Sequence, residues 1–179
     1  MYCGKNKTAC ATRRQTAEAL LVLLQDETYA QISVTQLCHA AGISRQTFYN
    51  LFRSKENVLV YILEEDCGYT HPRRRADAAG MVQDLAEDFS SYVTCHADVL
   101  KTLVENDMTH IVRDMLYEGL SDQDCIYGRL AQEARDYAAS FTAGALTGIA
   151  ESYVRGGCST EHDKLAGIIY TLLTGIYAR

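Results

Sequence analysis

Proline is almost absent from this sequence, in which Pro72 is the single proline among 179 residues. Alternating runs of β-branched residues are few, whereas Ala, Leu, Glu, Gln and Arg are frequent, so long stretches are free to be helical. Hydrophobic residues make up 47% of the chain, which is enough to bury a substantial core. The sequence therefore predicts an all-α protein.

Several other features are missing. There is no run of about 18 apolar residues, and the first residues mix charged with polar side chains without a clean small-residue cleavage site. The seven cysteines are odd in number and scattered, with no C-x-x-C pair. We therefore expect a soluble, cytoplasmic protein with no membrane partner and no metal site.

Sequence signatures of enzymes are missing too. The chain has no Gly-rich phosphate loop, no G-x-S-x-G motif and no His-x-x-x-His pair. Cys95 and His96 are adjacent, but successive side chains on a helix point in different directions. We expect no catalytic residues, no cofactor and no enzyme activity.

Charge is divided unevenly along the chain. Residues 1–60 carry seven Lys/Arg and four Asp/Glu, a net +3, whereas residues 61–179 carry ten and nineteen, a net −9. Opposite signs in the two parts indicate that they have different partners.

The N-terminal part shows a series of short helical segments. Apolar residues around Leu20 recur at helical spacing and predict a first helix over about residues 8–25. Thr35 is expected to cap a short second helix that runs through Ala41, and Gly42 is expected to end it.

A tight turn follows, after which Ser44 is expected to cap a third helix that continues to Phe52, and a fourth begins at Ser54. Two short helices joined by a Gly-containing turn form a helix-turn-helix, whose second helix fits the major groove of B-DNA. The residues expected to form the local core are Leu37, Cys38, Ile43, Phe48, Leu51 and Phe52.

The remaining side chains of the third helix are expected to face outwards. Arg and Gln can hydrogen-bond base edges, a Thr methyl group can contact a thymine methyl group, and a Tyr hydroxyl or a Lys can hold phosphates. The candidate DNA-contacting residues are Arg45, Gln46, Thr47, Tyr49, Asn50 and Lys55.

These residues, within the stretch "GISRQTFYNLFRSKENVL", resemble the TetR family of bacterial transcriptional regulators. The family pattern is Gly, an aliphatic residue, Ser, a variable pair, Thr-(Phe/Leu/Ile)-Tyr, a later aromatic, and Lys-Glu with an aliphatic pair. Two departures are "QDETYAQISV", where many members have a Gly, and Leu51, where His or Tyr is common. The resemblance implies an all-helical homodimer with DNA-binding heads. It implies that Arg45, Gln46, Thr47 and Tyr49 read the DNA and that Thr35 and Lys55 contact phosphates. We also include Ser44 among the candidate DNA-contacting residues.

A second domain is expected after the head. Pro72 disfavours helix at His71, so the connection lies near residues 69–77. We assign residues 1–60 to the helix-turn-helix domain and residues 61–179 to a helical bundle that binds an effector and dimerises. The helices expected in this bundle are 81–93, 97–105, 108–118, 126–154 and 161–178.

The last two expected helices carry apolar faces that are wide for surface helices. Pairing with their copies would make a four-helix dimer interface, and the alternative is a core within one subunit. The stretch "FTAGALTGIAESYVRGG" also resembles regulators of dihydroxyacetone-kinase operons. The predicted interface residues are Phe141, Ala145, Gly148, Ile149, Ile168, Leu172 and Ile176.

An effector pocket is expected between the helices of the second domain, although each candidate could also be an ordinary core residue. The candidates are Phe89, Tyr92, His96, Met108, His110, Met115, Tyr137 and Phe141. The sequence thus predicts a sequence-specific regulator that binds double-stranded operator DNA as a repressor controlled by an unknown small molecule. Two alternatives are a thiol-sensing regulator, with Cys67 and Cys95 near the hinge and pocket, and a protein-interaction co-regulator whose head does not bind DNA.

Overall fold

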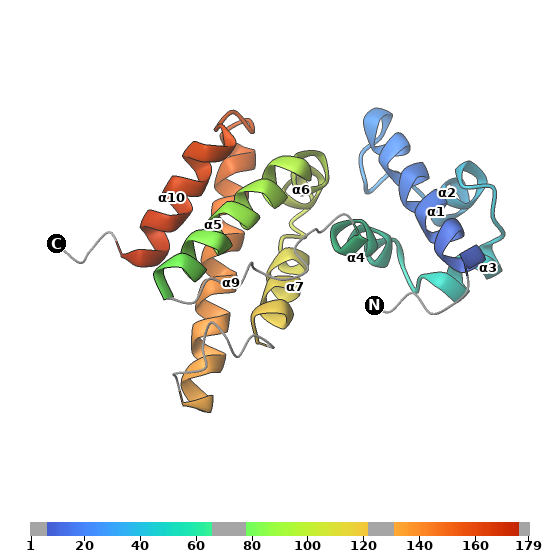
Figure 1. Cartoon of the computed structure of the whole chain (residues 1–179). Coiled ribbons are helices and arrows are strands. Elements are labelled where there is room, and N and C mark those ends of the chain that lie inside the picture. Colours follow the sequence, from blue (N-terminus) through green and yellow to red (C-terminus); the bar gives the residue numbers. More distant parts are fainter. Residues whose placement is uncertain (1–6, 66–77, 122–130, 176–179) are drawn as a thin grey trace. The chain divides into compact units, whose positions relative to one another are not determined.

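The structure, a computed structural model, describes residues 7–65, 78–121 and 131–175. These residues form nine helices and no strand (Figure 1). The expected all-α fold class is confirmed.

Contacts along the chain divide it into two compact units, residues 1–67 and 68–179. The boundary assigned from the sequence, after residue 60, lies inside a helix of the first unit. The helices of the first unit, which we call the head, are α1 Lys7–Asp26, α2 Val34–Ala40, α3 Arg45–Leu51 and α4 Lys55–Glu65.

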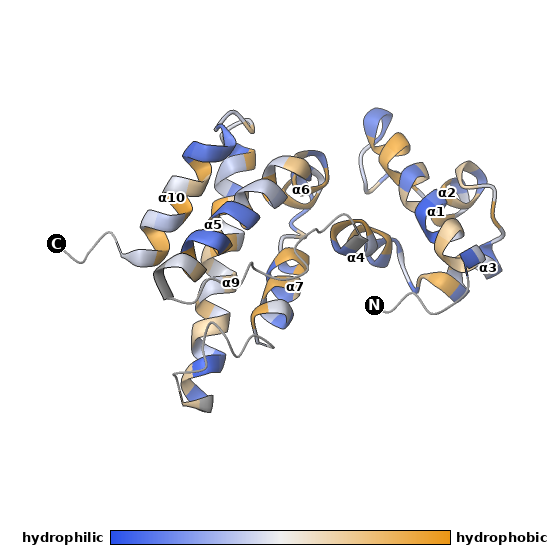
Figure 2. Cartoon of the chain, viewed as in Figure 1, coloured by the Kyte–Doolittle hydropathy of each residue, from blue (hydrophilic) through white to orange (hydrophobic). Residues whose placement is uncertain are grey.

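The core of the head forms where α1 packs against α2 and α4. Leu20 of α1, Leu37 of α2 and Leu59 of α4 are fully buried. The middle of α4 is almost continuously hydrophobic (Figure 2), which fits a helix with neighbours on more than one side. These three helices make a frame on which the short α3 is held.

The aromatic residues of α3 attach it to this frame. Phe48 is fully buried, and Phe52 packs edge-on against Tyr61 of α4, with ring centroids 5.8 Å apart. Of the expected local core, Leu37, Cys38, Phe48 and Phe52 are buried, whereas Ile43 and Leu51 are half-buried. One face of α3 is therefore fixed, and its other face is left to solvent.

The second unit contains two packed helix pairs among its described residues. α5 packs against α10, α7 packs against α9, and α6 also contacts α9. Fully buried side chains such as Phe89, Leu103 and Leu146 form the core. The bounds of these helices are α5 Ala78–Cys95, α6 Ala97–Glu105, α7 His110–Ser121, α9 Gln132–Arg155 and α10 His162–Thr174.

Two helix ends differ from the sequence prediction for a backbone reason. Asp107 adopts a left-handed conformation with φ 56°, and the Met108 N–H bonds back to the Leu103 carbonyl at 2.8 Å, so α7 begins at His110 instead of Met108. Gly175, with φ 101°, ends α10 at Thr174. The expected extension to residue 178, and the expected helix start at residue 126, lie outside the described residues.

Candidate functional site

The turn between α2 and α3 is built on Gly42. This residue has φ 61°, its N–H bonds to the His39 carbonyl at 3.1 Å, and the Ile43 N–H bonds to the Cys38 carbonyl at 2.9 Å. This pair of bonds is a Schellman motif, which ends a helix with a glycine in the left-handed region. The prediction that Gly42 ends the helix is confirmed.

Ser44 begins α3, as expected from the sequence. Its Oγ accepts a hydrogen bond from the Thr47 N–H at 3.0 Å and lies 2.9 Å from the Thr47 hydroxyl. These bonds satisfy an open N–H of the first turn and fix where the helix starts. The Ser44 and Thr47 hydroxyls are thereby paired with each other. The part of the Thr47 side chain that is left for other contacts is mainly its methyl group.

The outward face of α3 carries the side chains that the sequence singled out. Arg45, Gln46 and Asn50 are exposed, and Tyr49 is 48% exposed. The Tyr49 ring makes an edge contact with the buried Phe48 ring, with ring centroids 5.4 Å apart. Because Phe48 is held in the core, this contact orients the Tyr49 ring. A guanidinium, two amides and a phenol on one face of a short helix can hydrogen-bond base edges and phosphates.

The cap of α2 is Ser33, and the prediction that Thr35 caps it is wrong. The Ser33 Oγ accepts from the Gln36 N–H at 3.1 Å, and Ser33 has the extended backbone of an N-cap, with φ −86° and ψ 154°. Thr35 lies inside the first turn with its side chain exposed. Its hydroxyl therefore remains available to a partner outside the chain.

Lys55 is placed differently from the phosphate contact that was expected. Its Nζ donates to the Tyr29 carbonyl at 2.8 Å and to the Ile32 carbonyl, and lies 4.2 Å from the centre of the Tyr29 ring. Burial lowers the pKa of Lys55, and the nearby Glu56 carboxylate opposes this effect. Lys55 thus ties the start of α4 to the loop before α2.

A second contact holds the same loop. The Gln36 side-chain amide donates to the Glu27 carboxylate, and the Thr28 hydroxyl donates to the Gln31 side chain at 2.8 Å. The sequence analysis missed these partners because they are distant in sequence or are common polar residues. It also left out Arg53, an exposed cation just after α3 whose only sequence signal is its charge.

The expected effector residues fall into two groups in the second unit. Phe89, Tyr92 and His96 are buried one turn apart on or just after α5, and the Tyr92 hydroxyl points at Met115 Sδ, 3.9 Å away. Met108 and Met115 are half-buried.

The structure corrects the pocket prediction for the other three effector candidates, because it places them on the surface. His110 is exposed at the start of α7, and Tyr137 and Phe141 are 79% and 73% exposed on α9. The face of α9 that packs on α7 carries Ala139, Ala143 and Leu146 instead, so the two aromatic rings project away from the core of the unit.

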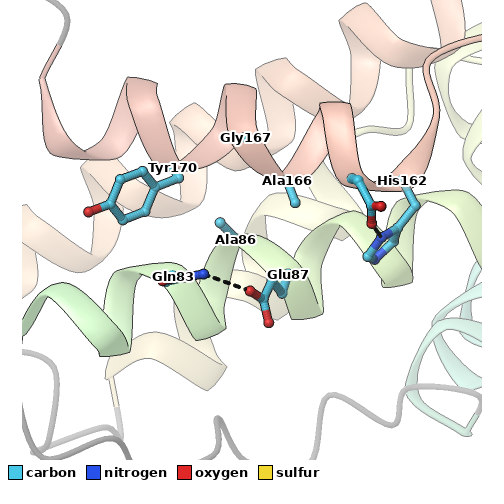
Figure 3. A pocket seen from close by; sticks show the side chains of 8 residues that line it. Gln83, Ala86, Glu87, His162, Ala166, Gly167 and Tyr170 are labelled. Carbon is cyan, nitrogen blue, oxygen red and sulfur yellow. Dashed lines mark hydrogen bonds and ion pairs between the residues drawn. The ribbon is translucent and has the colours of Figure 1, made fainter.

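A groove lies between α5 and α10, away from all the expected effector residues (Figure 3). It has a volume of about 550 Å³ and a floor of small residues, Ala86, Ala166 and Gly167. Its polar lining is paired internally: Gln83 donates to Glu87 at 3.0 Å, and His162 Nδ1 lies 3.0 Å from Asp163 (Figure 3).

The residues expected at a dimer interface lie on exposed parts of α9 and α10. Besides Phe141, Gly148 is exposed and Ala145 and Ile149 are half-exposed on α9, while Ile168 and Leu172 of α10 are 42% and 41% exposed. Ile176 lies outside the described residues. Apolar side chains exposed on two neighbouring helices are typical of a surface that another protein covers.

The cysteines divide into different environments. Cys10 is disulfide-bonded, whereas Cys38, Cys95 and Cys158 carry free thiols. Burial raises the pKa of the Cys38 thiol, which keeps it protonated and poorly nucleophilic. Cys67, part of the thiol-sensing alternative, lies outside the described residues.

No group of metal-ligating side chains, and no helix able to cross a membrane, occurs in the described part of the chain.

Comparison with known proteins points to one family. Residues 18–62 match the family model described as bacterial regulatory proteins, tetR family. The HTH-type dhaKLM operon transcriptional activator DhaS of Lactococcus lactis is 42% identical over 60 residues, which are 34% of this chain and 32% of DhaS. The HTH-type transcriptional regulator EthR of Mycobacterium tuberculosis is 55% identical over 42 residues, 24% of this chain and 19% of EthR. The matched segment thus spans a third or less of these curated relatives.

Solved structures resemble the fold of nearly the whole chain. The dihydroxyacetone kinase operon activator DhaS aligns with a TM-score of 0.60 and 23% identity over 91% of this chain and 94% of that chain. The fatty acid degradation regulator FadR from Bacillus halodurans aligns with a TM-score of 0.62 and 18% identity, covering 93% and 96%. The fold likeness therefore extends to the second unit, with 18–23% identity over the whole alignments.

Proposed function

We propose that the chain, whose residues 18–62 match the tetR family model, is a DNA-binding transcriptional regulator of the TetR family. In this proposal it binds operator DNA as a homodimer and represses transcription until an effector binds. The observation that carries this proposal is the outward face of α3, on which Arg45, Gln46, Tyr49 and Asn50 stand free of the core. The Ser44 cap and the Gly42 turn fix the start of that helix.

In this proposal the first turn of α3 enters the major groove. Arg45 and Gln46 read base edges, because guanidinium and amide groups make paired hydrogen bonds to guanine and adenine. Tyr49 and Asn50 contact bases or the backbone one turn later. The exposed Thr35 hydroxyl and the Arg53 guanidinium hold phosphates, a role for which Lys55 is poorly placed.

A dimer is needed because one head offers few base contacts. The head, residues 1–67, carries seven Lys/Arg and seven Asp/Glu, and the net charge of the whole chain is −6, so nonspecific attraction to DNA is weak. Two heads on a palindrome, with recognition helices about 34 Å apart, double the specific contacts. The exposed apolar residues of α9 and α10 supply the surface for pairing.

Effector control then follows from linkage. A molecule bound in the second unit lowers operator affinity if it prefers a dimer state in which the two heads no longer match successive major grooves. α4 is the natural lever, since it belongs to the head and precedes the connection to the second unit. We place the whole regulator in the cytoplasm, where its DNA lies.

One observation favours activation of transcription over repression. The relative DhaS, matched over 60 residues, is described as an activator. A transcription assay on the bound promoter separates the two: loss of the protein raises transcription if it represses and lowers transcription if it activates.

The first experiment is binding of the purified protein to its own upstream DNA across a salt series. The double variant Arg45→Ala/Tyr49→Ala should lose palindrome-specific binding by a factor of about one hundred or more, because each lost base contact costs about 1–3 kcal/mol. The matched control is Arg113→Ala/Tyr117→Ala, an Arg and a Tyr at the same spacing on the surface of α7. The control variant should bind like the wild type.

Each result is decisive for one part of the proposal. Equal affinities of the two double variants would remove α3 as the reading helix. Weak, salt-sensitive binding of the wild type to every sequence, including selected random DNA, would favour a protein-interaction role for the head. If effectors found by screening left operator affinity unchanged, the effector part would be wrong.

A further inference from the structure

The groove between α5 and α10 has the dimensions of a small-molecule site. Its volume is about 550 Å³, within the range of about 300–1,000 Å³ that is common for ligand pockets. The Ser90 hydroxyl donates to the His162 carbonyl at 2.8 Å and fastens the start of α10 to α5. His162 and Tyr170 lie at opposite ends of the groove (Figure 3), which therefore spans about two turns of α10.

Small residues keep this groove open. Ala86 and Ala166 are buried at its floor, and a Cβ added at Gly167 would meet nothing within 4 Å. Larger side chains at these positions would fill the space between the two helices. The groove therefore offers an apolar floor, to which the Tyr170 ring adds an aromatic surface at one end.

Carboxylates line the groove without a cation of the chain to pair with them. Glu87 is half-buried on the wall formed by α5, and its Oε1 accepts from the Gln83 amide at 3.0 Å. Its Oε2 has no hydrogen-bond partner in the described part of the chain. Asp163, on the wall formed by α10, is exposed and lies 3.0 Å from His162 Nδ1. None of the described lining residues is a Lys or an Arg, so the groove favours a positively charged ligand.

We propose that this groove binds a small organic cation in which an ammonium group is carried on an apolar body. The ammonium donates to Glu87 Oε2, because charge-assisted hydrogen bonds are stronger than the bond to the neutral Gln83 amide. The apolar body lies on Ala86 and Ala166 beside the Tyr170 ring. Where this inference makes the cation the effector, it rests on the proposed function.

The lining of the groove excludes other classes of ligand. An anion would meet two carboxylates and, among the described lining residues, no Lys or Arg. A metal ion needs several ligating side chains close together, and Glu87, His162 and Asp163 do not form such a group. A neutral apolar molecule would leave Glu87 Oε2 to water and gain nothing from its charge.

The effector residues expected on α5 offer no comparable space. The Tyr92 ring lies 4.6 Å from the His96 imidazole and 6.0 Å from the Phe89 ring, and all three side chains are buried. His96 Nε2 has no hydrogen-bond partner in the described part of the chain, but these closely packed rings leave no room beside it for a ligand.

The groove also lies between two helices that matter for the proposed function. α5 is the first described helix after the connection to the head, and α10 carries Ile168 and Leu172 of the proposed dimer interface. A cation that bridges α5 and α10 changes how these helices are held together. It can therefore favour one state of the dimer over another.

The test compares three probes that share a phenyl ring and a four-carbon chain: 4-phenylbutylamine, 4-phenylbutanol and 4-phenylbutyrate. In the full-length wild type, calorimetry should show the amine binding about tenfold more tightly than the alcohol, and the carboxylate binding most weakly. The amine should also shift the methyl ¹³C resonances of Ala86 and Ala166. It should leave in place the methyl resonances of Ala139 and Ala143, which are buried in α9.

Two variants and a matched control locate the contact. Glu87→Gln removes the charge at unchanged size and should lower the preference for the amine over the alcohol to about twofold or less. Glu118→Gln removes the same charge from the exposed surface of α7 and should keep the wild-type preference. Gly167→Leu places a side chain in the groove and should weaken binding of the amine and the alcohol alike, by about tenfold.

Three results would overturn the proposal. The first is an amine that leaves the methyl resonances of Ala86 and Ala166 in place. The second is a Glu87→Gln variant with the same preference for the amine as Glu118→Gln. The third is equal affinity of the wild type for all three probes, which would make the groove an apolar site. The methyl resonances are measured on the wild type, so this readout stands even if a variant fails to fold.

Operator binding is measured on the same samples, with and without the amine, and separates the two proposals. Methyl shifts in a protein that binds no operator would leave the site intact and remove the proposed function. Operator binding by a protein whose Ala86 and Ala166 methyl groups do not respond would do the reverse. Methyl shifts with an operator affinity that the amine leaves unchanged would keep the site and remove its role as the effector site.

Discussion

A single ammonium group holds the loop on which α2 rests. Lys55 Nζ bonds to the carbonyls of Tyr29 and Ile32, and Lys55→Met would leave both without this donor. We expect the head to lose about 2 kcal/mol of unfolding free energy, because hydrogen bonds to charged groups are among the stronger ones. Faster hydrogen exchange of the Gln31 and Ile32 amides, which close this loop, would show the loss.

The matched control is Lys101→Met. Lys101 is an exposed lysine that pairs with Glu105 at 3.9 Å, and both side chains are 61% exposed. Pairs of this kind contribute little, so the change in stability should stay within about 0.5 kcal/mol. If Lys55→Met and Lys101→Met changed the unfolding free energy equally, the Lys55 contacts would not stabilise the loop.

Gly42 is required by backbone conformation rather than by space. A Cβ at this position would meet only the Gln15 side chain, at 3.9 Å, which is ordinary contact, but φ 61° is unfavourable for alanine. Gly42→Ala should therefore lower stability by about 1 kcal/mol. Gly119→Ala, inside α7 and facing open space, should raise it by about 0.5–1 kcal/mol. Urea unfolding followed by circular dichroism measures both, and a shift of the same sign in the two variants would contradict the argument.

At the scale of the element, two residues at the start of α2, Ser33 and Thr35, allow helix stability and DNA binding to be tested separately. Ser33→Ala removes the cap and should cost about 1 kcal/mol of unfolding free energy, whereas Thr35→Ala removes no bond within the helix. We expect Thr35→Ala to weaken operator binding at unchanged stability, because its exposed hydroxyl is proposed to contact a phosphate. Thermal unfolding and operator titration of both variants test this, and the prediction fails if Thr35→Ala is the less stable variant.

The helices were predictable where one local signal dominates. Apolar spacing located α1, and Gly42 and Ser44 fixed the turn before α3, because these effects act over a few residues. The cap of α2 was misassigned because Ser33 and Thr35 are equally capable hydroxyl residues two positions apart. Local sequence does not say which one adopts the extended backbone.

The errors in the candidate sites arose from contacts between distant residues. Lys55 bonds to a carbonyl 26 residues earlier, which no local pattern reveals. Tyr137 and Phe141 have the hydrophobic character of a pocket lining, but the small residues on the opposite face of α9 pack against α7 and turn these rings outwards. The unpaired Nε2 of His96 depends on three-dimensional burial, so the sequence could name the residue but not its chemistry.

For the whole molecule, the proposed pairing of subunits would turn two weakly binding heads into a specific regulator. Ile168→Glu/Leu172→Glu places two charges on the exposed apolar face of α10, where pairing of subunits would bury them without partners. We expect light scattering to report a monomer and palindrome affinity to fall by a factor of about one hundred or more, because the second head then binds independently. Tyr117→Glu, at a partly exposed apolar position on α7, is the control and should remain dimeric. A double variant that stays dimeric would move the interface away from α10, whereas a monomer with full operator affinity would show that pairing is not needed for binding.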